Sequence, residues 1–430
     1  MADQRELTGW GEIAKHLGVS VRTAQAYERE FGLPVHRKPG SKGRVWAVPD
    51  ELDQWKQGGA GESYRQRHLT NEPEQATSSG LAGSRPRPRG PLLWLLVAGS
   101  TVVLVGLAAG IKYLHNLARR PASWRVAGNT LSVLGEDGSE LWHHAFPAPM
   151  EEGAYVSRSP VNCLFADVDG DGRMETIFSY HSWDPATRRL VCFNRNGTLR
   201  WQFLPGKSVR DNRGREFPPP YWPATFAVVR AKGSDARIVV SSNHHWSFPD
   251  QVAVLDGRTG RLLSEYWHRG HLPHMALADL DNSGRPEVLL GGVNDAPEYS
   301  QATLVVFDDR KIAGASCDPR GAVDFQGMAP GTEKHIIFFP RSLISQNEEF
   351  NRVVDVRVAS AGITVFVAEG IRESAPQVVY ELNRLLRPTS VSITDELWQL
   401  YRDWQANGKA PKESREAVND HLKDGFKMIR

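Results

Sequence analysis

Residues 165–178 read Phe-Ala-Asp-Val-Asp-Gly-Asp-Gly-Arg-Met-Glu-Thr-Ile-Phe, and residues 277–290 repeat the pattern as Leu-Ala-Asp-Leu-Asp-Asn-Ser-Gly-Arg-Pro-Glu-Val-Leu-Leu. In both segments, oxygen-bearing side chains occupy loop positions one, three and five, glycine occupies position six and glutamate occupies position nine. Apolar residues flank each loop and predict two strands that the loop joins. Alternate side chains of a tight loop can direct oxygen ligands at a hard cation, and the glycine permits the bend. The pattern therefore predicts two cation-binding loops between strands.

The loops differ from an EF-hand, which needs a glutamate at position twelve, where this chain has Phe178 and Leu290. They resemble instead the FG-GAP or VCBS repeat of integrin α-subunit-type β-propellers. That resemblance implies Ca²⁺ as the cofactor, with Arg173 contributing a backbone carbonyl. The metal-binding residues that it implies are Asp167, Asp169, Asp171, Arg173, Glu175, Asp279, Asp281, Ser283, Arg285 and Glu287. The alternative is that both segments are hairpin loops that use Asp and Gly for their turn-forming backbone preferences.

A second repeated element surrounds these loops and reads as strand, turn, strand. Its last apolar residue before the turn recurs about every 60 residues, a period typical of propeller blades. The five copies place this residue at Leu134, Phe193, Leu255, Phe307 and Phe366. A third copy of the cation loop, in residues 226–242, keeps its strands but has lost its acidic residues. We therefore expect an all-β propeller-like domain over residues 123–393, followed by two amphipathic helices within residues 394–430.

The first 57 residues have a different pattern. Ile13, Ala14 and Leu17 form an apolar helical stripe, Gly18 ends it, and Ser20 can cap a second helix. Residues 35–48 predict a basic hairpin. This stretch resembles the winged helix-turn-helix of the MerR and excisionase families, although the dimerisation segment of MerR regulators is missing. The resemblance implies the following DNA-binding residues: Ser20, Arg22, Thr23, Gln25, Arg29, Arg37, Lys38, Lys42 and Arg44. The alternative is a scaffold whose basic wing contacts a protein or lipid headgroups.

The two domains are separated by a polar linker, residues 58–91, and an uncharged apolar run, residues 92–111. A helix of that length spans about 30 Å, the thickness of the hydrocarbon core of a bilayer. We therefore expect one transmembrane helix in a cell inner membrane. Basic residues flank the run on both sides, so charge does not set its orientation. The domain chemistry favours a cytoplasmic N-terminus and a periplasmic or other extracytoplasmic C-terminal domain.

Composition adds three limits. A net charge of +2 shows no general basic excess, so DNA binding would depend on local clusters. The three cysteines form neither a disulfide framework nor a zinc-finger pattern. Gly206-Lys207-Ser208 lacks the leading glycine of a phosphate-binding loop, and the His271–His274 pair lacks the context of a metalloprotease motif. We predict that the chain is not an enzyme, with a quinoprotein-like enzyme as a minor alternative because hairpins end in Trp142 and Trp201.

Together these features predict a multidomain protein with a small α winged helix-turn-helix, a single transmembrane helix and an all-β propeller-like repeat domain. The expected function is a one-component transcriptional regulator that binds DNA and senses an unknown extracytoplasmic ligand or protein. Binding to a two-fold operator would need a homodimer, which Gly106 and Gly110 of the membrane segment could support. The alternative function is an envelope adhesion or scaffold protein with a protein-binding head.

Overall fold

The computed structural model describes residues 7–17, 24, 28, 33–37, 45–57, 120–156, 161–230, 235–295, 300–318, 320–372 and 374–429. The chain divides into two units, Met1–Leu93 and Trp94–Arg430.

The described residues of the smaller unit combine the two helices α1 and α3 with a three-stranded antiparallel sheet in the order β1-β3-β2. Its described elements are β1 (Leu7–Thr8), α1 (Trp10–Leu17), β2 (His36–Arg37), β3 (Val45–Ala47) and α3 (Pro49–Gln57). The apolar stripe of α1 is buried, and Ile13 and Leu17 belong to one core with Val45 and Leu52. Burial of this face supports a helix that is only 8 residues long.

The prediction of a small α-type winged helix-turn-helix is wrong for this unit. Strand β1 precedes the first helix and pairs with β3, with Leu7 opposite Ala47, so the core lies between helices and a sheet. A winged helix-turn-helix is not evident in the part of the unit that the structure describes. Only Ala24 and Glu28 of the segment predicted as the recognition helix belong to that part.

The transmembrane prediction is also corrected. In the described part of the chain, no helix is both long enough and apolar enough to cross a bilayer. The predicted membrane segment, residues 92–111, and the predicted linker, residues 58–91, both lie outside the described residues. The structure therefore does not support the expected single-pass inner-membrane location.

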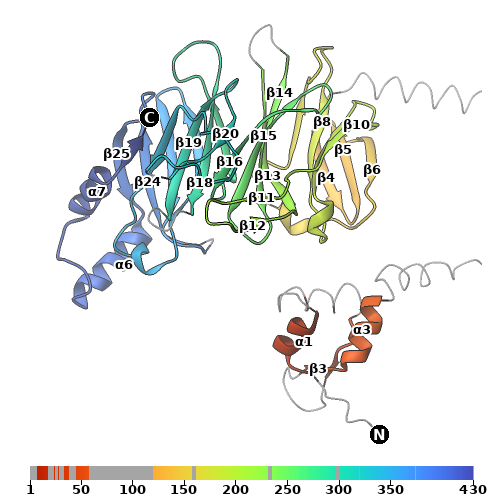
Figure 1. The fold of residues 1–430 in the computed structure, drawn as a ribbon, viewed down its shortest axis with the longest axis horizontal. Helices are drawn as coiled ribbons and strands as arrows, with labels where there is room; N and C mark the ends of the chain where they lie inside the picture. The colour runs from red at the N-terminus through yellow and green to blue at the C-terminus, as the bar shows by residue number, and fades with distance from the viewer. Residues whose placement is uncertain are drawn as a thin grey trace, which may run out of the picture. The chain divides into compact units, whose positions relative to one another are not determined.

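The larger unit consists mostly of antiparallel strands in five successive sheets (Figure 1). The first sheet contains β4 (Pro121–Ala127), β5 (Thr130–Gly135) and β6 (Glu140–Ala145). The second contains β7 (Cys163–Ala166), β8 (Glu175–Tyr180), β9 (Arg189–Phe193) and β10 (Leu199–Phe203). The third contains β13 (Tyr221–Val229), β14 (Arg237–His244), β15 (Pro249–Asp256), β16 (Leu262–Arg269) and the parallel strand β20 (Gly314–Ala315).

The fourth sheet contains β17 (His274–Ala278), β18 (Glu287–Asn294), β19 (Gln301–Asp308), β21 (His335–Phe338) and the C-terminal strand β26 (Lys427–Ile429). The fifth contains β22 (Arg352–Ala359), β23 (Gly362–Ala368), β24 (Gln377–Leu382) and β25 (Pro388–Ile393). A short hairpin joins β11 (Val209–Arg210) to β12 (Glu216–Phe217), and two helices follow the fifth sheet, α6 (Asp395–Ala406) and α7 (Arg415–Asp424).

Successive sheets are joined by tryptophan side chains that pack on glycines of the next sheet. A Cβ atom at Gly197 would lie 2.8 Å from the ring of Trp142, and one at Gly260 would lie 2.6 Å from the ring of Trp201. Both glycines also have positive φ angles, +80° and +70°, which favour glycine in their hairpin turns. The hairpin repeat thus holds the first sheet to the second and the second to the third.

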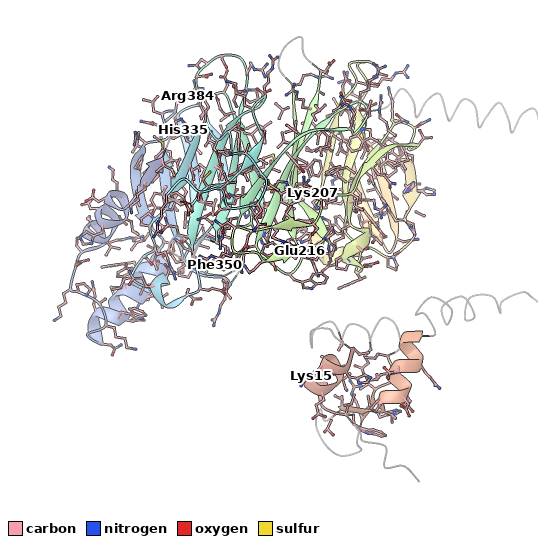
Figure 2. The ribbon with its side chains drawn as sticks, viewed as in Figure 1. Lys15, Lys207, Glu216, His335, Phe350 and Arg384 are labelled. Carbon is pink, nitrogen blue, oxygen red and sulfur yellow. The ribbon has the colours of Figure 1, made fainter. Side chains whose placement is uncertain are left out.

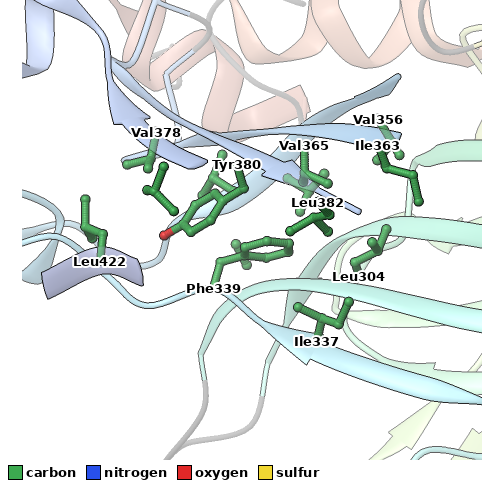
Figure 3. Packing of buried hydrophobic residues seen from close by; sticks show 14 of the residues in the cluster. Leu304, Ile337, Phe339, Val356, Ile363, Val365, Val378, Tyr380, Leu382 and Leu422 are labelled. Atoms are coloured by element: carbon green, nitrogen blue, oxygen red, sulfur yellow. The ribbon is translucent and has the colours of Figure 1, made fainter. Parts of the chain in front are cut away.

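The largest core lies between the fourth and fifth sheets and includes side chains of α6 and α7. Figure 3 shows Phe339 facing Tyr380 in this core, with Leu422 of α7 nearby. The two ring centroids are 4.8 Å apart, and both side chains are fully buried. The two C-terminal helices therefore pack into the core beside the last sheet.

The five sheets follow one another in a row, and the described residues show no closure of this row into a ring. Figure 1 shows β4–β6 at one end of the row and β22–β25 with the C-terminal helices at the other. No buried apolar cluster of the described residues joins the first sheet to the fifth. Both end faces carry charged or polar side chains, such as Arg125 and His143 on the first and Arg357 and Glu381 on the last. Such faces do not provide the apolar contact that would close a ring.

Candidate metal centres

The first acidic loop joins β7 to β8 and brings three carboxylates together. One oxygen each of Asp167, Asp169 and Glu175 lies within 4.8 Å of the others. Asp167 is fixed by the loop backbone, because its Oδ1 accepts the N–H of Gly170 at 2.6 Å and its Oδ2 accepts the N–H of Gly172 at 3.1 Å. Glu175 is almost fully buried, and its Oε2 accepts the N–H of Val168 at 3.0 Å. The loop therefore holds a preformed cluster of oxygen atoms.

The second acidic loop joins β17 to β18 and repeats this arrangement. Asp279, Asp281 and Glu287 also place one carboxylate oxygen each within 4.8 Å of the others. Asp279 accepts the N–H groups of Ser283 and Gly284, each at 2.9 Å, and Glu287 accepts the N–H of Leu280 at 2.9 Å. In both loops, the aspartate at position one thus accepts the N–H of position six, and the glutamate at position nine accepts the N–H of position two. The same loop geometry occurs in two different sheets.

The remaining predicted ligands lie outside these two groups of three carboxylates. Asp171 accepts the N–H of Arg173 at 2.7 Å. The hydroxyl of Ser283 lies 3.5 Å from the carbonyl oxygen of Arg285, whose guanidinium forms an ion pair with Asp309. The structure thus brings together three of the predicted ligands in each loop.

Arginine side chains from neighbouring strands enter the first loop. Arg200, on β10, lies 2.6 Å from Asp169 and 3.6 Å from Glu175. Arg230, at the end of β13, lies 3.4 Å from Asp167. Arg200 is also anchored elsewhere, because its Nε donates to the carbonyl of Arg258 at 3.0 Å and its Nη1 donates to Asn194 at 3.2 Å. Its guanidinium is therefore fixed against the carboxylates.

In the second loop, the basic partner is a lysine. Lys334 precedes β21, and its Nζ contacts Glu287 directly and lies 3.4 Å from Asp281. The side chain of Lys334 is 39% exposed, whereas that of Arg200 is 18% exposed. A lysine has a flexible stem and a single charged nitrogen, so it leaves such a contact more easily than an anchored guanidinium. Sequence reasoning missed all three basic residues because they lie far from the loops in the chain.

The two loops also set the ionisation of their carboxylates. Burial alone would raise the pKa of Asp167, but the N–H donors of Gly170 and Gly172, together with Arg230, lower it below its ordinary value. Burial raises the pKa of Glu175, despite the N–H group of Val168 and the charge of Arg200. In the second loop, hydrogen bonds from Ser283 and then the contact with Lys334 lower the pKa of Asp281. Asp167 and Asp281 are thus held as anions, as cation ligands must be.

The predicted DNA-binding surface is not supported. Arg37 is the one predicted contact residue in the described part of the smaller unit, and its guanidinium forms two hydrogen bonds with Glu28, at 2.6 and 3.0 Å. This ion pair reduces the attraction between the Arg37 guanidinium and a DNA phosphate. The other predicted residues lie outside the described residues: Ser20, Arg22, Thr23, Gln25, Arg29, Lys38, Lys42 and Arg44. The DNA-binding helix-turn-helix prediction is therefore corrected together with the fold of the unit.

Comparisons with known proteins give no family. No family model matches the chain, and no curated protein matches it. Among solved structures, the C-terminal domain of PilY1 from Pseudomonas aeruginosa is similar at 14% identity and a TM-score of 0.34, over 60% of this chain and 56% of that one. A rhamnogalacturonan lyase of Bacillus licheniformis is similar at 11% identity and a TM-score of 0.25, over 64% of this chain and 52% of that one. The chain thus spans little more than half of either structure.

Proposed function

We propose that the larger unit is a calcium-binding module whose two acidic loops each hold one ion, and that it serves as a binding or scaffold protein rather than an enzyme. The observation that carries this proposal is the recurrence of one loop geometry. In each of two loops from different sheets, one oxygen from each of three carboxylates lies within 4.8 Å of the others, and the same backbone hydrogen bonds hold the loop. Turn formation alone requires an aspartate at a loop start, but it does not require a buried glutamate at position nine in both copies.

The donor set fits a hard divalent cation. Ca²⁺ prefers several carboxylate and carbonyl oxygens and tolerates irregular geometry. Asp167, Asp169 and Glu175 would hold one ion, and Asp279, Asp281 and Glu287 would hold the other. When bound, each ion would supply positive charge that offsets the repulsion between the clustered carboxylates. Arg200 and Lys334 supply that charge in the structure, so calcium would have to compete with them.

The role that we propose for the ions is to brace the loops. Each loop joins the first two strands of its sheet, so a cation there would tie the two strand ends together. Rigid loops on a stacked-sheet scaffold are suited to presenting a binding surface. This role agrees with the alternative expected from the sequence, a scaffold protein, and needs neither DNA binding nor a membrane anchor.

The experiment is calorimetric titration of the full-length protein with CaCl₂ and, separately, with MgCl₂. We expect two equivalents of Ca²⁺ to bind, and one equivalent to remain in each of the double variants Asp167→Asn/Asp169→Asn and Asp279→Asn/Asp281→Asn. Asp256→Asn is the matched control, because Asp256 caps an ordinary hairpin turn through Thr259 at 2.8 Å. Absence of saturable calcium binding to the wild-type protein would overturn the proposal.

A further inference from the structure

A pocket with a volume of about 700 Å³ lies at the opposite edge of the sheets from the acidic loops. The hairpin β17–β18 connects the two places, since its loop carries the second acidic cluster while His274 at the start of β17 and Val293 near the end of β18 line the pocket. Figure 2 shows Phe350, at the pocket, on the lower edge and Arg384, which contacts Asn282 of the acidic loop, on the upper edge. The volume is within the range of small-molecule sites, about 300–1,000 Å³.

Aromatic rings form much of the pocket wall. Trp222, Phe248 and Phe350 come from three separate segments of the chain. The ring centroids of Phe248 and Phe350 are 6.0 Å apart in an edge-to-face arrangement, and His271 lies 5.6 Å from Phe248. The ring of Trp222 contacts the ring of His181, 5.6 Å away, and the guanidinium of Arg188, at 5.9 Å. These aromatic rings are therefore fixed in place by their own contacts, and the charged side chain of Arg352 lines the pocket with them.

Two neutral polar groups of the pocket have no hydrogen-bond partner among the described residues. They are Oδ1 of Asn243, whose residue is 4% exposed, and Nδ1 of His274. The nearby His271 differs, because its Nε2 bonds the carbonyl of Ser247 at 2.7 Å. A buried polar atom without a partner costs about 1–3 kcal/mol. Both atoms belong to residues that line the pocket and are shielded from water in the structure, so a ligand that bonds them must displace the groups that cover them.

We propose that this pocket binds a sugar residue, most simply a pyranose, stacked on Trp222 and the two phenylalanines and hydrogen-bonded to Asn243 and His274. A pyranose ring has an apolar C–H face and a rim of hydroxyl groups. Each hydroxyl both donates and accepts, so one ligand can satisfy an amide oxygen and an imidazole nitrogen. An entirely apolar ring would pack against the aromatic wall but would leave Oδ1 of Asn243 and Nδ1 of His274 without a hydrogen bond.

The turn between β14 and β15 lies beside the pocket and extends its aromatic surface. Asn243 and Phe248, at its two ends, line the pocket, and Trp246 between them is 71% exposed. An exposed indole next to the pocket provides a second stacking surface for the next residue of an oligosaccharide. The pocket thus fits a sugar within a chain as well as a single ring. This inference is independent of calcium binding.

The test uses the full-length protein and saturation-transfer NMR with methyl glycosides of glucose, galactose, mannose, rhamnose and galacturonic acid. Tryptophanamide serves as an apolar ring for comparison. We expect at least one glycoside to bind with a Kd below about 10 mM, a range typical of single-sugar contacts that bury one ring. Asn243→Ala should weaken that binding at least tenfold while leaving the Tm unchanged, because it removes an unpaired buried atom.

Phe350→Ala provides a second variant that removes stacking and should weaken binding of the same glycoside. Phe366→Ala is the control, because Phe366 packs under Arg357, 4.4 Å away, on the outer face of the last sheet. Failure of every glycoside to bind would overturn the proposal. So would tighter binding of tryptophanamide than of any glycoside with no change in Asn243→Ala, since the pocket would then select apolar rings.

Discussion

The two acidic loops share a backbone but differ in the cations that already contact them. The first loop has the larger number of acidic residues, yet the anchored Arg200 lies 2.6 Å from Asp169 and Arg230 lies 3.4 Å from Asp167. The second loop has a serine in place of one acid, but among the residues that the structure describes only the half-exposed Lys334 forms ion pairs with its three clustered carboxylates. This difference indicates that the number of acidic ligands in a loop motif is not sufficient to predict which loop binds calcium more tightly. We expect the second loop to bind calcium more tightly than the first.

The largest expected effect follows removal of the buried glutamate of the second loop. Glu287→Gln should weaken the tighter calcium-binding step by more than about 100-fold, because it removes a charged ligand that the backbone holds in place. Calorimetric titration measures this change. Glu381→Gln is the control, since Glu381 bonds Thr364 on the outer face of the last sheet. Retention of the tighter step in Glu287→Gln would assign it to the first loop and reverse the ranking.

Removal of the competing arginine should raise affinity at the first loop. Arg200→Gln is expected to strengthen its calcium binding about tenfold, because the ion no longer has to displace a fixed guanidinium. Lys334→Gln should change the second loop less than about threefold, since the lysine withdraws easily. Thermal unfolding gives a second measurement: Arg200→Gln should have a lower Tm without calcium and recover it when calcium is added. Equal changes in calcium affinity in Arg200→Gln and Lys334→Gln would contradict the proposed difference between the two loops.

The calcium affinities of the two loops are best compared above pH 7, because buried histidines elsewhere in the larger unit make its stability depend on pH below that value. Burial lowers the pKa of His181 and of His268 to about 3 and that of His271 and of His274 to about 4. A histidine with a lowered pKa in the folded state stabilises the fold above its unfolded pKa and loses that contribution as the pH falls toward the folded value. Stability should therefore decline from about pH 6.5 to pH 4.

Asp250 acts in the opposite direction, because burial raises its pKa to about 7 and its contribution is lost as the pH rises toward that value. Urea unfolding at several pH values tests the balance. His268→Gln should reduce the slope of stability against pH between pH 4 and 6 by about 1.4 kcal/mol per pH unit, the contribution of one proton. An unchanged slope would show that His268 is not the buried neutral group that its surroundings indicate.

The smallest expected effect concerns the serine of the second loop. Ser283→Asp gives this loop the acidic pattern of the first, but it should change calcium affinity by less than about threefold. The reason is that the equivalent Asp171 lies outside the group of three carboxylates and bonds the N–H of Arg173. A titration that shows an increase of more than tenfold would mean that position five supplies a ligand after all.

The sequence predicted the parts of the molecule that are local in the chain. The loop spacing placed Asp167, Asp169 and Glu175 in one cluster, because a tight loop between two paired strands brings these positions together. It could not identify Arg200 or Lys334, which come from other strands through tertiary packing. The pocket was missed for the same reason, because Trp222 and Phe248 of the third sheet approach Phe350, which precedes the fifth sheet, only when the sheets stack.

The prediction of a propeller-like domain concerns a different level of structure. The hairpin period correctly indicates a repeated unit, and Trp142 and Trp201 show how one unit packs on the next. Ring closure, however, depends on the outer faces of the first and last sheets, which carry charges such as Arg125 and Arg357. At the N-terminus, the pattern predicted two helices and a hairpin, whereas pairing of β1 with β3 adds a strand that a two-residue segment does not reveal in sequence.

The most direct test of the ranking is a crystal structure of the wild-type protein grown with one molar equivalent of calcium, with anomalous scattering used to locate the ion. We predict a peak between Asp279, Asp281 and Glu287, with Lys334 withdrawn from the carboxylates and Arg200 still in contact with Asp169. A peak in the first loop while Lys334 keeps its contacts, or no peak in either loop, would contradict the account.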